Sequence, residues 1–449
     1  MKARPKSHAS QGNFLLPTLA EQCDPRHPLR KLAERLPWVS LEKAFADHYS
    51  AEGRPAKPVR LMVGLLLLKQ MFNQSDESVV ERWKENPYWQ QFCGMEHFQW
   101  DLPCDPSDLV YFRQRIGETG MEQLLGISVW MHGERGQERE IIIDSTVAEK
   151  NITWPSDVKA YRKIIERSWK LADQHKVRLR RRYRKEVRKH LQAQRWNKNP
   201  RRRKKARAAR RRLCTIAGAL VRELERKLPE QERARQQENF ALYRRVLRQK
   251  TRDKEKIYSL HEPHVYCMSK GKEHKKYEFG VKASVAIGKE HGVIVAAVAH
   301  ARNEYDGHTL YEVLEHAEVL TGKRAEAAVC DRGYRGRTKV GGTEIHVPEA
   351  GAGGRSEGEK RKARKRFRRR ASIEPVIGHL KSDYRLARCY LKGFAGDQMN
   401  LLLAATAWNL RKWMREAVSF WLRMLHFWQG MLQALLAPLP MPAIGHAGI

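Results

Sequence analysis

Three acidic residues stand in settings that favour metal chemistry on a phosphodiester. Asp144 follows the apolar run Glu140-Ile-Ile-Ile143, and Asp331 follows Ala327-Ala-Val-Cys330. Both runs have the length and apolar character of buried strands, so both carboxylates are expected at strand ends. Glu374 comes later, directly after a dense basic run. Two strand-end Asp residues and a Glu on a later helix can converge on one metal site.

Such a site suits metal-assisted cleavage of a phosphodiester. Two Mg2+ ions about 4 Å apart can activate the attacking oxygen and stabilise the leaving oxygen. Mg2+ prefers carboxylate oxygens and keeps several waters, so a few Asp and Glu residues suffice without Cys or His. We therefore expect Asp144, Asp331 and Glu374 to hold two Mg2+ ions, with Mn2+ able to substitute.

The charge of the chain indicates a polyanionic substrate. Its 449 residues include 87 Lys+Arg and 51 Asp+Glu, for a formal net charge of +36. A field of this strength concentrates a polyanion and makes DNA affinity depend steeply on salt. Anionic membrane and ribosomal RNA are rival partners, but neither requires three placed carboxylates.

Other patterns exclude several classes of protein. The seven Cys residues are scattered and include no Cys-x2-Cys pair, which argues against disulfides or a zinc ribbon and favours a reducing cytoplasm. His261 and His264 have a ligand-like gap, but no second pair follows, so a structural role is favoured over a metal role. The N-terminus has no apolar signal core, and the apolar stretches 61–68 and 418–436 are too short or too interrupted to span a bilayer. A soluble protein with no membrane partner is expected.

The elements that must position the three acids form a mixed α/β domain. The predicted order of elements from Glu140 is a strand, two hairpin strands, a helix, two further strands and then helices. This order fits a mixed sheet of the ribonuclease H type. We assign this catalytic domain to residues 140–155 and 251–400. Ser372 is expected to cap the helix that carries Glu374, and helical spacing places Lys381 on the same face as Glu374. The predicted elements are strands over 278–287, 292–299, 326–330 and 344–347 and a helix over 306–320.

Three helical regions accompany this domain. Residues 1–139 contain short helices with N-cap signals, which suit a helix-turn-helix-like DNA-binding domain or a generic helical bundle equally. Residues 156–250 contain 34 Lys/Arg and 9 Asp/Glu, so about +25 of the charge lies there. Apolar residues at helical spacing predict that this segment is a basic helical insertion lying along DNA, and the alternative is a solvated, partly disordered linker. Residues 401–449 are expected to form a C-terminal helical tail.

Three sequence blocks surround the acids. They are Ile-Ile-Ile-Asp-Ser-Thr around Asp144, Cys-Asp-Arg-Gly-Tyr-Arg-Gly around Asp331, and Ile-Glu-Pro-Val-Ile-Gly-His-Leu-Lys around Glu374. In this order they resemble the catalytic blocks of bacterial insertion-sequence DDE transposases, with insertion sequence family five as the most similar branch. The resemblance extends over nearly the whole chain and implies a ribonuclease H-like fold, Mg2+ dependence, binding of terminal inverted repeats and a dimeric DNA complex.

Related transposases carry the signature Y-x2-R-x3-E-x6-K. Arg370, Glu374 and Lys381 fit its spacing, but Phe367 stands where the signature has Tyr. A phenol that could hydrogen-bond a DNA phosphate is therefore missing at that position. The candidate DNA-binding residues are Arg370, Lys381, Arg332, Arg335 and Phe367.

We therefore expect a transposase in the bacterial cytoplasm that acts as a homodimer on transposon ends and target DNA. A metal-activated water would nick each end, and the released 3′-hydroxyl would attack a target phosphodiester. Two alternatives stay open. One is a ribonuclease H-fold nuclease without strand transfer, and the other is a non-catalytic DNA-binding relative, for which the three acids would have no use.

Overall fold

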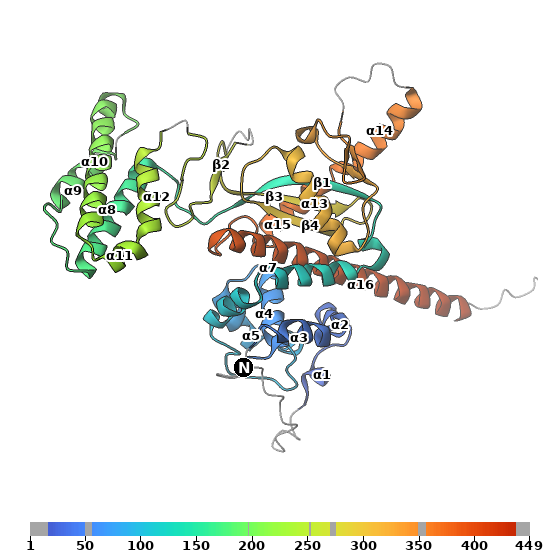
Figure 1. Cartoon of the computed structure of the whole chain (residues 1–449). Helices are drawn as coiled ribbons and strands as arrows, with labels where there is room; N and C mark the ends of the chain where they lie inside the picture. Colours follow the sequence, from blue (N-terminus) through green and yellow to red (C-terminus); the bar gives the residue numbers. More distant parts are fainter. Residues whose placement is uncertain are drawn as a thin grey trace, which may run out of the picture.

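The chain folds around one mixed β-sheet, with helices before it, inserted into it and packed over both its faces (Figure 1). This confirms the mixed α/β architecture and the helical N-terminal region predicted from the sequence. The computed structural model describes residues 17–49, 56–195, 197–250, 253–269, 275–348 and 356–436.

In the described residues the sheet has seven strands in the order β2-β3-β1-β5-β7-β6, and β4 pairs with β3 on the same edge as β2. β1 is antiparallel to β3 and parallel to β5, β3 is antiparallel to β4, and β5 is parallel to β7. The strands are β1 (Glu140–Glu149), β2 (Tyr266–Met268), β3 (Glu278–Gly288), β4 (Ile294–His300), β5 (Ala327–Val329), β6 (Lys339–Val340) and β7 (Thr343–His346).

The central strand β1 is longer than its apolar run predicts. It continues to Glu149, because β3 pairs with it without interruption from Ile141 onward. The two backbones approach so closely that a Cβ atom on Gly280 would lie 2.0 Å from the carbonyl oxygen of Ala148. The prediction that Asp144 ends a strand is therefore wrong, since Asp144 lies inside β1.

Both faces of the sheet are buried, which explains the unbroken apolar run at the start of β1. Ile141 and Ile143 belong to the core formed with α13 (Asp306–Thr321). Ile142 belongs to the other core, formed with α15 (Ile373–Ser382) and α16 (Gly393–Leu436).

The N-terminal helices share that second core rather than forming a separate one. The helix α4 is buried along nearly its whole length, and α7 packs against α16 and α13 after a kink at Gly117, whose φ is 61°. The N-terminal helices are α1 (Leu19–Gln22), α2 (Pro28–Arg35), α3 (Trp38–Ala46), α4 (Val59–Met71), α5 (Asp76–Glu85), α6 (Pro87–Phe92) and α7 (Pro106–Trp130), followed by the short helix η2 (Gly133–Gly136).

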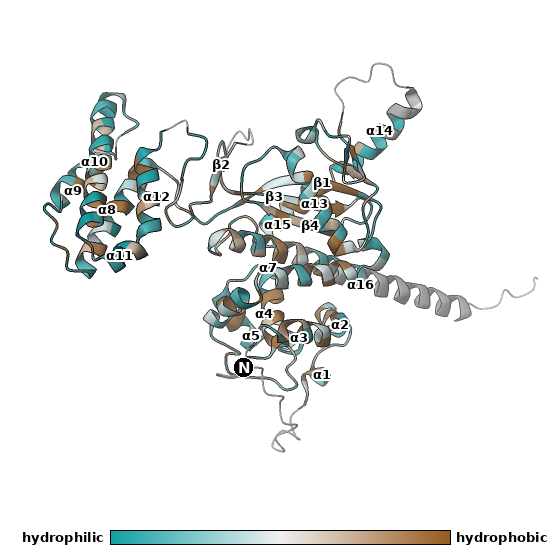
Figure 2. Cartoon of the chain, in the orientation of Figure 1, coloured by the Kyte–Doolittle hydropathy of each residue, from teal (hydrophilic) through white to brown (hydrophobic). Residues whose placement is uncertain are grey.

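Between β1 and β2 the chain forms a helical insertion that stands to one side of the sheet (Figure 1). Its helices enclose a small apolar core of their own, while their outer surfaces are hydrophilic (Figure 2). This segment is therefore folded rather than an extended linker. Its helices are α8 (Asp157–Gln174), α9 (Arg184–Ala193), η3 (Pro200–Arg202), α10 (Arg203–Lys227), α11 (Glu230–Arg235) and α12 (Gln237–Arg248).

The C-terminal elements depart from the prediction in two places. The boundary expected at residue 401 falls inside α16, whose residues 401–410 are buried in the core because they cover the sheet. Ser372 precedes α15 but makes no capping hydrogen bond, because its backbone is already helical after α14 (Glu357–Arg370). Among the described helices, none combines the length and apolar content that crossing a membrane requires. Residues 437–449 of the expected tail lie outside the described residues.

Candidate active site

The register of two parallel strands brings Asp144 and Asp331 to the same level of the sheet. Val329 of β5 lies opposite Ile142 of β1. Two residues further along each strand come Asp331 and Asp144, and the backbone is still extended at Asp331. Because side chains alternate along a strand, both carboxylates belong to the face of Ile142 and Val329, which α15 and α16 cover.

Backbone amides orient both carboxylates. Oδ1 of Asp144 accepts a hydrogen bond of 2.7 Å from the amide of Ser145. Oδ1 of Asp331 accepts one of 2.7 Å from the amide of Gly333 and so caps the short helix η4 (Arg332–Tyr334). Both Asp residues are half-buried, so their carboxylates remain accessible to a ligand.

Two buried neighbours report a concentration of negative charge at this point. Burial raises the pKa of the Tyr334 phenol well above its ordinary value, and the charges of Asp306, Asp144 and Asp331 raise it further. Burial likewise raises the pKa of the Cys330 thiol, with Asp331 and Asp144 adding to the effect. Three carboxylates therefore lie around these two side chains.

The third of these carboxylates, Asp306, was not identified from the sequence. Asp306 opens α13, and its Oδ1 lies 3.0 Å from Nζ of Lys282. A Cβ atom on Gly333 would lie 2.9 Å from Oδ1 of Asp331 and 3.1 Å from Oδ2 of Asp306, so only a glycine leaves room between the two acids. The available signal was its position, since Asp306 begins the helix that follows a predicted strand.

Glu374 lies on α15, which packs against β1 through its apolar face. Its side chain is 62% exposed, and Oε1 accepts a hydrogen bond of 3.3 Å from Arg370, one helical turn earlier. The predicted apolar stripe of α15 is confirmed, since Ile373, Val376 and Leu380 are buried. Glu374 thus stands beside the strand that carries Asp144, with its carboxylate held by Arg370.

The structure places the candidate DNA-binding residues in three settings. Arg332 and Arg335 are exposed on and directly after η4, next to Asp331. Arg370 and Lys381 are half-buried near the two ends of α15. Phe367, on α14, is half-buried and packs against the main apolar core, which favours a core role for its ring over a DNA contact.

The acidic residues supply the hard oxygen donors that Mg2+ prefers. In the described parts of the chain, however, no three Asp, Glu, His or Cys side chains stand close enough together to hold one ion. The structure thus places Asp144 and Asp331 together and leaves Glu374 turned toward Arg370.

The two His residues considered as ligands have other partners. Nδ1 of His261 lies 2.8 Å from the hydroxyl of Ser259. Nε2 of His264 lies 2.9 Å from Asp397, which also pairs with the buried Lys150 at 2.9 Å. This network ties the end of β1 to the start of α16, so both His residues have structural contacts.

Comparison with known proteins yields two family matches and one relative. Residues 17–115 match the family described as Transposase domain (DUF772), and residues 247–410 match the Transposase DDE domain. The chain is 43% identical over 165 residues to "Uncharacterized protein ORF8 in nfe locus" of Rhizobium meliloti, which covers 36% of this chain and 80% of that protein. No solved structure matches. Asp331 and Glu374 lie inside the second match, whereas Asp144 and most of the helical insertion lie outside both.

Proposed function

The chain belongs to the insertion-sequence DDE transposases, and from this we propose that it binds the terminal inverted repeats of its own element and moves that element by DNA cleavage and strand transfer. The observation that carries the proposal is the gathering of Asp144, Asp331 and Asp306 around Tyr334, beside the helix of Glu374. A protein that only binds DNA gains nothing from carboxylates that would repel phosphate.

We propose that the sheet is of the ribonuclease H type. The strand order supports this: β4, β3 and β1 form an antiparallel meander, and β5 and β7 follow parallel to β1. Asp144 lies on the central strand β1, and Asp331 follows the adjacent parallel strand β5.

Asp144, Asp331 and Glu374 are the proposed metal ligands. The donor set fits Mg2+, because it consists of carboxylates, and the nearby Cys330 thiol, with its raised pKa, stays protonated and is a poor competing ligand. Two Mg2+ ions, or Mn2+ in their place, would supply the charge that activates the attacking oxygen and stabilises the leaving one. Asp306 is a further candidate, since its carboxylate lies beside that of Asp331 across Gly333 and its Oδ1 pairs with Lys282 at 3.0 Å.

Glu374 must exchange partners before it can join the other acids. Glu374 is 62% exposed and pairs with Arg370 one helical turn earlier. Solvent-exposed i,i+4 pairs of this kind contribute only about 0.3–0.5 kcal/mol. We propose that a phosphate of the transposon end takes Arg370, which frees Glu374 for the metal. DNA binding would thereby complete the site, and Lys381, Arg332 and Arg335 would hold neighbouring phosphates.

The partners proposed are duplex transposon ends, target DNA and a second copy of the chain on the DNA. The net charge of +36 supports the DNA partners. The place of action would be the bacterial nucleoid in the cytoplasm, where such DNA lies.

The test replaces each acid by its neutral isostere. Asp144→Asn, Asp331→Asn and Glu374→Gln should each abolish Mg2+-dependent nicking of an end substrate while end binding persists, and combining them should add little. Glu326→Gln is the matched control. Glu326 is exposed at the opposite end of β5, where it pairs with Arg139 at 3.4 Å, so its removal should leave nicking unchanged.

Robust nicking by any one of the three variants would exclude that residue from the metal site. A pre-cut end with a free 3′-hydroxyl separates transposition from simple hydrolysis, because only a transposase joins it to target DNA. Cleavage without joined product would support the nuclease alternative.

A further inference from the structure

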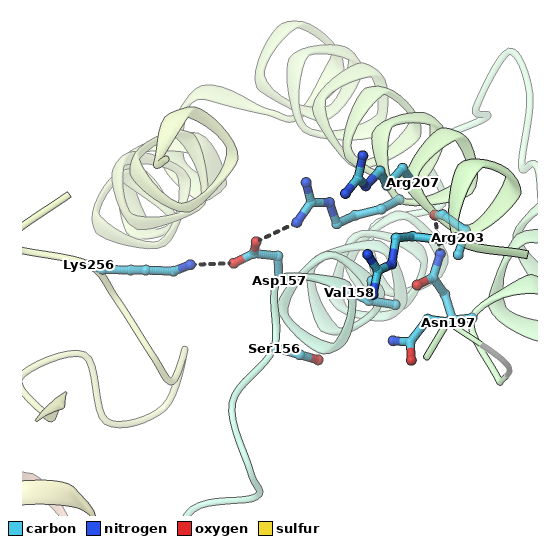
Figure 3. Close-up of a pocket in the computed structure, with 10 residues that line it drawn as sticks. Ser156, Asp157, Val158, Asn197, Arg203, Arg207 and Lys256 are labelled. Carbon is cyan, nitrogen blue, oxygen red and sulfur yellow. Dashed lines mark hydrogen bonds and ion pairs between the residues drawn. The ribbon is translucent and has the colours of Figure 1, made fainter. Parts of the chain in front are cut away.

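A cavity of about 590 Å³ lies at the root of the helical insertion, where the chain enters at Ser156 and returns at Lys256 (Figure 3). The start of α8 forms one wall and the first turns of α10 form another. Arg203, Arg207 and Arg210 line it from α10, and their spacing of four and three residues puts them on one face of that helix.

The charges of this cavity are not balanced. Asp157 is the one acidic residue among the lining side chains. Its Oδ1 pairs with Lys256 at 2.8 Å, a contact that Figure 3 shows, and its Oδ2 pairs with Arg210 at 3.5 Å. Within the described residues, Arg203 and Arg207 form no ion pair. Two guanidinium groups therefore face the cavity without an anion.

We propose that this cavity, the root pocket, binds phosphate groups of the DNA backbone through Arg203 and Arg207. The guanidinium fork matches the oxygens of a phosphate and binds them in pairs. The inference rests on the proposed function, because that function makes duplex DNA the substrate. It adds a contact outside the catalytic sheet and outside both family matches.

The root pocket is connected to the strand that carries Asp144. β1 leads directly into the root, where the ring of Trp154 packs edge-on against Phe279 of β3 at 5.1 Å. The Asp157–Lys256 pair joins the entering and returning segments of the insertion. A phosphate held in the root pocket therefore fixes DNA relative to the catalytic sheet rather than to the far end of the insertion.

Replacing Asp157 should change DNA affinity in the opposite direction to replacing Arg203 and Arg207. Its carboxylate repels a phosphate and also occupies Lys256 and Arg210. Asp157→Asn removes the repulsion and releases both cations, so DNA affinity should rise. A cluster that served only the packing of the root would lose stability and gain no affinity.

The experiment compares two double variants of equal charge in the full-length protein. Arg203→Ala with Arg207→Ala removes the two pocket cations that form no ion pair within the described residues, while Arg222→Ala with Arg226→Ala removes two exposed cations of α10 outside the pocket. Affinity for a 30-base-pair duplex of unrelated sequence is measured from 50 to 300 mM salt. The pocket variant should weaken binding about tenfold and reduce the slope of log affinity against log salt by about 2, since each lost phosphate contact lowers it by about 0.9. The control should lose less than half of this, and Asp157→Asn should bind more tightly.

Three results would overturn the inference. Equal losses in the two double variants would show a diffuse field without a phosphate site. Weaker binding by Asp157→Asn at an unchanged melting temperature would contradict the charge argument. Inorganic pyrophosphate binding that is lost in the pocket variant while duplex affinity stays normal would assign the pocket to a small free anion. Failure of the wild type to bind any duplex would instead refute the proposed function itself.

Discussion

Replacing Lys69 with Met should stabilise the protein at neutral pH, although it removes a buried ion pair. Lys69 lies on α4 and shares Asp76 with Arg113 of α7. The Arg113 fork binds both oxygens of Asp76 at 2.7 Å, and Nζ of Lys69 adds a contact of 2.8 Å. All three side chains are at most 16% exposed. One carboxylate thus neutralises two buried cations, of which Lys69 is the redundant one.

The pKa values show which partner the burial disfavours. Burial alone would raise the pKa of Asp76, but the hydrogen bond from Arg113 and the charge of Lys69 outweigh it and lower the pKa to about 2. Burial and the charge of Arg113 lower the pKa of Lys69 to about 8 from 10.5, despite the attraction of Asp76. The folded state therefore favours ionised Asp76 and disfavours protonated Lys69.

Both lowered pKa values make stability rise with pH, but in different pH ranges. The contribution of Asp76, about 2 kcal/mol, is present above pH 4 and is lost as the pH falls toward 2. Lys69 binds its proton more tightly in the unfolded chain, so stability rises with pH from about 8 to about 10.5. Linkage gives a gain of about 2 kcal/mol by pH 9.5. Lys69→Met lacks this gain, so the stability of the wild type relative to the variant should rise by that amount between pH 7 and 9.5.

The assay is urea unfolding followed by tryptophan fluorescence at several pH values. Lys84→Met is the matched control, because Lys84 is exposed on α5 and should give a difference that does not vary with pH. Asp76→Asn should cost about 3–5 kcal/mol, since it leaves two buried cations without their anion. A difference between wild type and Lys69→Met that stays flat from pH 7 to 9.5 would refute the reasoning. So would a loss of several kcal/mol in Lys69→Met at pH 7.

Four further changes have defined outcomes. Tyr334→Phe removes a fully buried hydroxyl that has no hydrogen-bond partner among the described residues, and thermal melting should show a gain of about 2–4 °C. Asp306→Asn should slow metal-dependent nicking about 10–100-fold and leave end binding intact in a gel-shift assay. Phe367→Tyr should cost about 1–3 kcal/mol in a melting experiment without any gain in end affinity, because the ring packs against the core. Replacing residues 158–255 by a short Gly-Ser link should flatten the salt dependence of DNA binding and leave the preference for the cognate end unchanged.

The sequence predicted those parts of the site that depend on local pattern. The apolar runs before Asp144 and Asp331 identified two buried strands, and the spacing around Glu374 identified a helix with one apolar face. These signals are local because burial on both faces requires an unbroken run of apolar residues, and a helix packed on a sheet requires a stripe.

The parts that failed depend on partners distant in sequence. β1 continues past Asp144 through Ser145 and Thr146 because β3 supplies hydrogen bonds, and no local pattern shows that partner. Asp306 was missed because it is far from Asp331 in the sequence. The two carboxylates come together only where the chain passes between them at Gly333. Residues 401–410 were predicted to belong to a C-terminal tail. The sequence shows that this helix is hydrophobic, but it does not show that the helix packs on the sheet.

The charges at the candidate site show how the fold tolerates several acids close together. Like charges gathered at a half-buried point repel one another, and the protein offsets this with nearby cations. Asp306 has Lys282 at 3.0 Å, and Glu374 has Arg370 at 3.3 Å. A DNA phosphate can bind Lys282 or Arg370 in place of the acid. Mg2+ can replace the positive charge beside the acid. In the proposed mechanism, the pairs that stabilise the DNA-free protein keep Asp306 and Glu374 from the metal ions, which would keep hydrolysis low until a transposon end is bound.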